Sequence, residues 1–433
     1  MKNNKFLKSV IILTIGNILT KIISMLIKIV LARTLKTEGI GVYMLITPTF
    51  TLLMAIASLG FPVAISKLVA EEKRNNKNLV FSLIPITLIV NFIIMIFLLL
   101  TSKYISNNLL HEERCNLAII NIGFVLPFIS ISSILRGYFF GKEKMIPHVI
   151  SNITEDLVRL FIIILFLPAY MEKGIESAVA FVVKVNMISE LTSIIILLFF
   201  IPKKFKINIS DIKPKKENII DTFSIALPTT GSRIIGTIGF FLEPIILTYA
   251  LTKSGYTNKF IINEYGTISG YILPLILLPS FFTLAISEAI VPNISKAYIN
   301  KNYKYISKKT KTAIFLSLLI GIPATILFEI FPNIPMKIIY NTNKGINYLK
   351  VFAPIALFHY IQSPLTATLQ AMGKAKESMM GTLGGTIIRL IVLLVFSLLR
   401  IKMWGLIIAI SANIIYVTLH QAYKIKQILK KGS

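Results

Sequence analysis

The sequence predicts an all-α integral membrane protein with about twelve transmembrane helices in two six-helix lobes. Of the 433 residues, 55% are hydrophobic and only 15% are charged, and the mean hydropathy is +0.76. Apolar stretches of about 20 residues, the length a helix needs to cross the hydrocarbon, recur along the whole chain. The two halves of the chain also repeat several short sequence matches.

Charged or turn-forming residues separate the apolar stretches, and we expect twelve of these stretches to cross the membrane. The expected spans are residues 9–31, 41–62, 79–101, 117–139, 151–170, 177–201, 220–250, 266–291, 312–332, 347–368, 379–399 and 403–423. The first is interrupted by lysines and lacks a small-residue cleavage site, so we predict an uncleaved helix rather than a signal peptide.

The formal net charge of +27 would suit a nucleic-acid-binding protein if the chain were soluble, but its distribution indicates a membrane topology instead. If the N-terminus lies in the cytoplasm, the inner segments carry more than twice as many Lys and Arg residues as the outer segments. Cytoplasmic loops of membrane proteins carry this excess. We therefore expect a multi-pass protein with both termini in the cytoplasm, in contact with membrane lipids and not with nucleic acid.

Short matches relate the two halves at offsets of 212 to 232 residues. They pair Thr20–Ile23 with Ser232–Ile235, Pro62, Ser66 and Lys67 with Pro292, Ser295 and Lys296, Gly141 with Gly373, and Arg159 with Arg389. Six spans return the chain to the same side, so two such halves have parallel orientation and a binding site is expected between them at the midplane. We predict an N-terminal lobe (1–200), a basic cytoplasmic linker (201–218) and a C-terminal lobe (219–433).

Lys21 is the most informative residue, because it lies near the middle of the first span. A lysine there costs roughly 2.5–3.5 kcal/mol on insertion scales and is functional by default. Asn17, Lys21, Ser24 and Lys28 recur at helical spacing and form one polar face. We expect this face to line an interior cavity that accepts an anion, although Lys28 could instead extend its ammonium to the outer interface.

Arg233 occupies the place in the second half that Lys21 has in the first, so we predict Lys21, Lys28 and Arg233 as substrate-binding residues. Glu155 and Arg159 are four residues apart, so they can be a structural ion pair or part of a gate. The candidates for gating or ion coupling, of which the two glutamates of the second half can equally be counter-charges, are Glu155, Asp156, Arg159, Glu243, Glu288 and Arg389.

Catalysis has little support in the sequence. Of four histidines only His359 lies well inside a span, and no HExxH, GxSxG or Walker-type phosphate loop occurs. Cys115 is the only cysteine, so a chain by itself forms neither a disulfide nor a cysteine-based metal site. We expect a protein that is not an enzyme and has no metal or cofactor.

Three segments carry a family resemblance: Leu31–Tyr43 (LARTLKTEGIGVY), Gly60–Glu72 (GFPVAISKLVAEE) and Leu135–Lys144 (LRGYFFGKEK). They resemble the stage V sporulation protein B and lipid II flippase branch of the multidrug/oligosaccharidyl-lipid/polysaccharide exporter superfamily. The resemblance implies a V-shaped alternating-access transporter of the bacterial cytoplasmic membrane. It also implies a lipid-linked sugar substrate whose pyrophosphate is bound by basic residues of a central cavity, with the cationic positions of the first helix carried over onto Lys21 and Lys28.

One departure from this branch matters: its members usually have fourteen spans, and we count twelve, which leaves open the route of the polyprenyl tail. The first alternative is a cation-coupled multidrug exporter of the same superfamily, which predicts an acidic cavity. The second alternative is a membrane-embedded glycosyl- or acyltransferase, which would need a carboxylate or histidine cluster at a membrane face.

Overall fold

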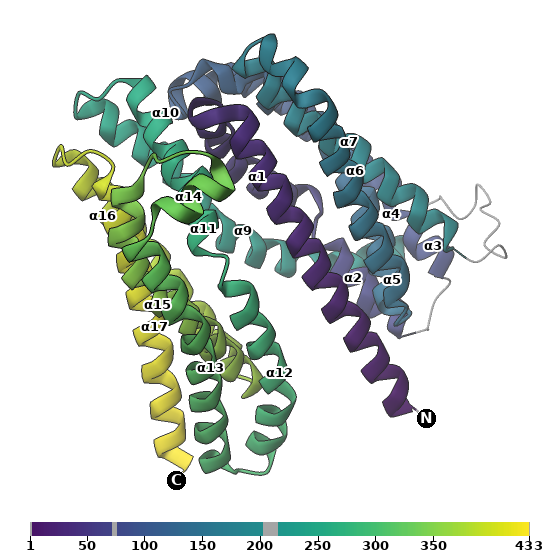
Figure 1. Ribbon diagram of the computed structural model, residues 1–433. Coiled ribbons are helices and arrows are strands. Elements are labelled where there is room, and N and C mark those ends of the chain that lie inside the picture. The colour runs from purple at the N-terminus through teal and green to yellow at the C-terminus, as the bar shows by residue number, and fades with distance from the viewer. Residues whose placement is uncertain (1, 72–75, 202–214, 433) are drawn as a thin grey trace. The chain divides into compact units, whose positions relative to one another are not determined.

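The computed structural model describes residues 2–71, 76–201 and 215–432, and in this part of the chain helices and short connections make up the whole fold, without a strand (Figure 1). By their internal contacts the residues form two compact units, Met1–Pro244 and Ile245–Ser433. The predicted linker 201–218 lies mostly outside the described residues. The predicted lobe boundaries therefore stay a prediction.

In its described residues, the first unit contains nine labelled helical elements and the beginning of a tenth. They are α1 (Lys2–Ala57), α2 (Phe61–Ala70), α3 (Asn76–Phe81), α4 (Leu83–Tyr104), η1 (Ile105–Leu109), η2 (Glu113–Cys115), α5 (Asn116–Gly141), α6 (Met145–Glu172), α7 (Ile175–Phe199) and the first part of α9 (Lys216–Lys253). The second unit continues from the end of α9. It contains α10 (Asn258–Gly266), η3 (Thr267–Ile272), α11 (Leu273–Ile276), α12 (Ser280–Ile299), α13 (Tyr303–Ile330), α14 (Asn333–Tyr340), α15 (Ile346–Ala371), α16 (Ala375–Leu398) and α17 (Trp404–Gly432).

Each predicted span coincides with helical structure, which confirms the predicted fold class. By length and composition, eight helices of the described chain could cross a membrane, or nine if the bent pair Asn258–Ile276 and Ser280–Ile299 is one span. The first of the eight contains two predicted spans, because the helical conformation of α1 is broken at Lys36 (φ 57°, ψ −171°). The other two predicted spans are α6 and α15, and α6 carries three charged residues near its middle.

The eighth predicted span differs from expectation, since it is not a continuous helix. The chain bends by 47° between Ile276 and Ser280. Pro274 and Pro279 flank this break, and proline removes a backbone donor and clashes with the preceding helical turn.

The two units pack their helices in the same order, as a parallel internal repeat predicts. In the first unit α2 and α4 pack on α5, and both α5 and α6 pack on α7. In the second unit α12 and α13 pack on α15, and both α15 and α16 pack on α17. Arg159 and Arg389, matched in the sequence, each lie fourteen residues after the first residue of their helix.

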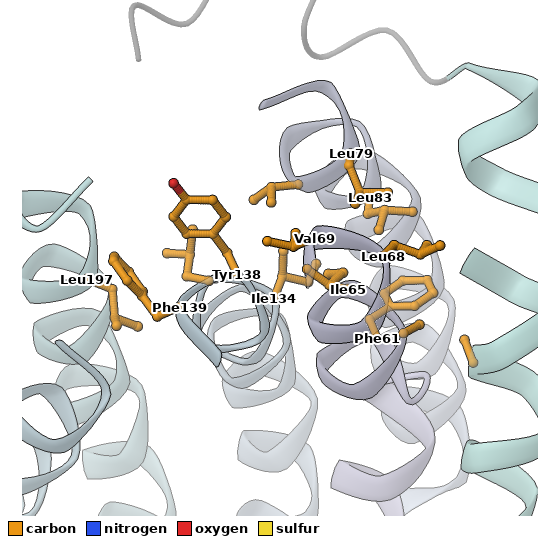
Figure 2. Close-up of a cluster of buried hydrophobic side chains, with 14 of the residues drawn as sticks. Phe61, Ile65, Leu68, Val69, Leu79, Leu83, Ile134, Tyr138, Phe139 and Leu197 are labelled. Atoms are coloured by element: carbon orange, nitrogen blue, oxygen red, sulfur yellow. The ribbon is translucent and has the colours of Figure 1, made fainter. Parts of the chain in front are cut away.

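Two of the three segments that carry the family resemblance, residues 60–72 and 135–144, contribute to one core of the first unit. Ile65 and Val69 of α2 lie toward Ile134 and Tyr138 of α5, as Figure 2 shows, and Phe61 belongs to the same cluster on the other side of α2. Two glycines of α5 let the backbones approach: a Cβ on Gly137 would lie 2.8 Å from the carbonyl oxygen of Pro62, and one on Gly141 would lie 2.6 Å from that of Ser66. The glycines of the segment 135–144 therefore permit a close contact between α5 and α2, the helix that carries the segment 60–72.

Candidate functional site

The first half of α1 presents three different surfaces. Gly16 and Ile27 are buried, and α1 packs here against α6. At 3.6 residues per turn, the exposed apolar side chains of this segment gather on a second surface; they are Ile15, Ile18, Leu19, Ile22 and Leu26, with exposed fractions from 43% to 54%. The predicted polar face, with Lys21 and Lys28, is the third surface, and it lies between the other two.

Lys21 and Lys28 are both exposed on this polar face. The two side chains start about 10 Å apart along the helix axis, because each residue rises 1.5 Å. Within the described residues no carboxylate lies within ion-pair distance of either ammonium group. Both cations are therefore available to an external anion.

Ser24 lies between the two lysines and links the polar face to the next helix. Its hydroxyl donates a hydrogen bond of 3.4 Å to Oδ2 of Asp156 on α6. The other oxygen of Asp156 is 3.4 Å from Nη1 of Arg159. The lysine-bearing face of α1 is thus in direct contact with the predicted charged residues of α6.

Glu155 is the centre of a buried ion-pair cluster on α5, α6 and α7. Its Oε1 accepts a hydrogen bond of 2.5 Å from Arg159, and its Oε2 accepts one of 2.5 Å from Arg136 of α5. The Glu155 side chain is 9% exposed, while those of Arg136 and Arg159 are 19% and 22% exposed. Both readings of the Glu155–Arg159 pair remain open, because the pair forms and is also part of a larger network.

Glu190 of α7 completes the cluster. One of its carboxylate oxygens accepts a hydrogen bond of 2.6 Å from Ser132 of α5 and lies 3.6 Å from Arg136. Two further α7 hydroxyls contact the guanidinium groups, Ser193 that of Arg136 at 2.8 Å and Ser189 that of Arg159 at 3.3 Å. The cluster holds three carboxyl groups against two guanidinium groups, so full ionisation leaves one negative charge in excess.

Arg233 lies in a different part of the first unit, in an open pocket of about 330 Å³. Its Nη1 is 3.5 Å from the hydroxyl of Ser58, at the end of α1. The pocket is also lined by hydroxyls from α1, α5 and α9: Thr51, Ser133 and Thr237. Apolar side chains, Met54, Ala55 and Ile129, line the same pocket. A guanidinium in an open pocket that also holds hydroxyls is an arrangement that can bind an anion.

Of the remaining predicted residues, Glu243 belongs to the first unit, and Glu288 and Arg389 belong to the second. Glu243 is buried at 6% exposure on α9, ten residues and so about 15 Å along the helix from Arg233. Glu288 is exposed on α12, and Arg389 is half-buried on α16. Their predicted roles in gating or ion coupling stay predictions.

Two charged members of the cluster, Glu190 and Arg136, are not among the predicted site residues. Glu190 lies inside the predicted span 177–201 and Arg136 lies inside 117–139, so a charge within a predicted span could have identified both residues. Arg136 also falls within the resemblance segment 135–144, which contains the two glycines that contact α2. The partners of Arg136 are Glu155 on α6 and Ser193 on α7, which lie 19 and 57 residues further along the chain. Spacing within one helix does not reveal contacts of this kind.

The chain matches the family model described as "Polysaccharide biosynthesis protein" over residues 6–298. The chain belongs to this family. A second model, described as MatE, matches residues 267–395. Family membership agrees with the resemblance that the sequence motifs indicated.

Two relatives of this family member are stage V sporulation protein B and lipid II flippase MurJ, both from Bacillus subtilis (strain 168). The first is 32% identical, over 99% of this chain and 85% of the relative. The second is 20% identical, over 90% of this chain and 77% of the relative. The family member is thus a membrane transporter of the exporter superfamily, related to this sporulation protein and to this lipid II flippase.

Among solved structures, the fold matches an inward-facing conformation of a multidrug resistance MATE family transporter of the MOP superfamily. The TM-score is 0.72, with 98% of this chain and 99% of that chain covered and 16% sequence identity. This likeness shows the two-lobe exporter fold.

Proposed function

We propose that the chain is a flippase that exports a lipid-linked oligosaccharide or peptidoglycan precursor, carried on undecaprenyl pyrophosphate, across the bacterial cytoplasmic membrane. The cationic face of α1 carries this proposal. Lys21 lies at mid-span and is exposed, on a surface separate from the apolar side chains that suit lipid. A lysine at that depth faces a water-filled cavity rather than hydrocarbon.

The substrate class follows from the charge of this face. Two lysines whose side chains start about 10 Å apart along the helix axis, with no carboxylate of the described chain within ion-pair distance, suit an anionic headgroup. A pyrophosphate would be bound by charge-assisted hydrogen bonds, which are stronger than neutral ones. The relatives named as a sporulation protein and a lipid II flippase support the same class.

In this proposal the buried cluster serves gating or ion coupling in an alternating-access cycle with a cationic central cavity. Asp156 contacts Ser24 between the two lysines, so a change in the charge of the cluster acts on the substrate-binding face directly. Glu155 and Arg159 connect this aspartate to α5 and α7. Movement of α1 against α6 would therefore be coupled to the ion pairs.

The test is complementation of a bacterium depleted of its own lipid II flippase. Growth restored by this chain, and lost when Lys21 is replaced by Ala at the same membrane level, would establish transport of a lipid-linked precursor. Absence of growth at a verified membrane level would remove the peptidoglycan precursor from the proposal.

A cation-coupled multidrug exporter is the second candidate, and the excess carboxyl group of the buried cluster favours it. An acidic site of that kind suits a cationic drug or a coupling ion. Resistance to cationic dyes in a strain without its own exporters, lost when Asp156 is replaced by Asn, would support this candidate. A chain that restores growth of the depleted strain without giving such resistance would exclude it.

A further inference from the structure

A groove of about 750 Å³ lies on the second unit, between α13 and α17. Both helices pack against α15, and Figure 1 shows these three helices running side by side. Leu365 of α15, which is 3% exposed, lines the floor of the groove. The groove is therefore bounded by two helices that pack on one shared helix and have few direct contacts with each other.

The walls combine apolar side chains with cations. Ile314 of α13 and Ile425 and Leu429 of α17 provide apolar surface continuous with the core cluster of this unit. Four lysines line the same groove: Lys304, Lys311, Lys426 and Lys430. The lining residues that the structure describes include no carboxylate, so the groove is cationic as well as apolar.

A neighbouring pocket of about 300 Å³ in the second unit shows that lysines without a carboxylate in the lining are not a general feature of this unit. It also contains lysines, Lys374 and Lys424, but it is lined by Glu377 as well. The ammonium of Lys424 is 2.9 Å from the Glu377 carboxylate. That pocket therefore has a carboxylate partner for its lysines, whereas Lys304, Lys311 and Lys426 have no carboxylate among the described residues that line the groove.

We propose that this groove binds an anionic glycerophospholipid of the inner leaflet, with its phosphate among the lysines and the upper part of an acyl chain on the apolar wall. The predicted topology places the start of α13 and the end of α17 at the cytoplasmic surface. Basic pockets between transmembrane helices on that side bind anionic headgroups. The proposal does not depend on what the protein transports.

The experiment is native mass spectrometry of the full-length protein in detergent, titrated with phosphatidylglycerol or with zwitterionic phosphatidylcholine. We expect phosphatidylglycerol to bind and phosphatidylcholine to bind much more weakly. Lys311→Gln and Lys426→Gln should each weaken phosphatidylglycerol binding by about fivefold, the effect of one lysine near an anionic surface. The double variant should lose most of the binding.

Lys308→Gln is the matched control, because Lys308 is exposed on the same helix and is not among the groove lining. It should bind phosphatidylglycerol like the unsubstituted protein. Thermal unfolding of every variant shows whether the fold is retained. Equal loss in Lys308→Gln, or undiminished binding by the double variant, would overturn the proposal.

A third titration uses a polyprenyl pyrophosphate. Displacement of phosphatidylglycerol at low concentration, with sensitivity to the Lys311 and Lys426 substitutions, would make the groove a substrate site and overturn assignment to a phospholipid. Binding that is insensitive to these substitutions but lost in Lys21→Ala would leave the phospholipid assignment in place. Failure of the proposed transport function changes neither outcome.

Discussion

The guanidinium of Arg136 on α5 lies 2.5 Å from the carboxylate of Glu155 on α6. Glu155 also binds Arg159 on its own helix at the same distance, so one carboxylate compensates two cations. Because the three side chains are mostly buried, the loss of this one carboxylate leaves two guanidinium groups without their principal partner. The pair therefore joins α5 to α6 beside the face that bears Lys21.

Glu155→Ala should lower the thermal stability of the protein strongly. Removing one partner of a buried ion pair costs about 3–5 kcal/mol when the remaining charge has no other partner. Glu190 at 3.6 Å from Arg136 and Asp156 at 3.4 Å from Arg159 would remain, so we expect a loss at the lower end of this range, about 3 kcal/mol. Thermal unfolding in detergent measures the effect. Glu377→Ala is the control, since its pair with Lys424 is about one-third exposed and surface pairs contribute little. A midpoint for Glu155→Ala no lower than that of the control would contradict the structural importance of the cluster.

Lys21→Ala should reduce transport of the lipid-linked substrate by about tenfold or more, because a hydrogen bond to a charged group contributes roughly 1.5–3 kcal/mol. Lys21→Arg should keep part of the activity, since the charge persists with a different geometry. Lys28→Ala should have a smaller effect. Complementation and flipping in reconstituted vesicles provide the measurement.

Lys103→Ala removes an exposed lysine at the end of α4 and should leave transport unchanged. Full activity of Lys21→Ala at normal membrane levels would refute the cationic-cavity mechanism. The multidrug candidate would then be favoured.

Arg233→Ala should reduce the same transport activity if this guanidinium contacts the anionic headgroup, and Arg233→Lys should restore part of it. Ser58→Ala removes the 3.5 Å contact with Arg233 and the 3.3 Å hydrogen bond that the hydroxyl donates to the Ala55 carbonyl oxygen. Both contacts are long, so its effect should be within about threefold, as expected for weak hydrogen bonds. Membrane levels and unfolding midpoints should be measured alongside transport. Equal losses from Ser58→Ala and Arg233→Ala would indicate a packing role for the pocket rather than binding of substrate by Arg233.

Gly137→Ala should destabilise the protein by about 1–3 kcal/mol, the usual cost of overpacking. The added methyl group would lie 2.8 Å from the Pro62 carbonyl oxygen, so the backbones of α2 and α5 must separate. Gly231→Ala is the matched control, because no described atom outside its own helix surroundings lies within 4 Å of its added Cβ. This control should be neutral or stabilising, since alanine favours helix, and an equal loss in both variants would contradict the close contact.

Accessibility from outside the cell tests the predicted topology. A cysteine at Lys173, an exposed residue of a predicted outer loop, should react with an impermeant reagent, whereas one at Lys216, on the predicted inner side, should not. The unsubstituted protein gives the background, because its single cysteine, Cys115, is buried. Labelling at Lys216 without cell lysis would reverse the orientation.

The sequence by itself predicted the helical membrane fold, the positions of the spans and the polar face of α1. Each of these depends on local information: hydrophobic length for a span, and the 3.6-residue period for the face that carries Lys21 and Lys28. The Glu155–Arg159 pair was predictable for the same reason, since its members are one helical turn apart. The repeat was also readable, because matched residues keep nearly the same offset.

Only the tertiary structure decided which helices bring their polar side chains together. Arg136 meets Glu155 because α5 and α6 both pack on α7, and Ser24 meets Asp156 from 132 residues away. The lysine-lined groove likewise joins one face of α13 to one face of α17 over a shared support. The hydrophobic period places a residue on a face of its own helix, whereas the packing of side chains between helices determines which faces meet.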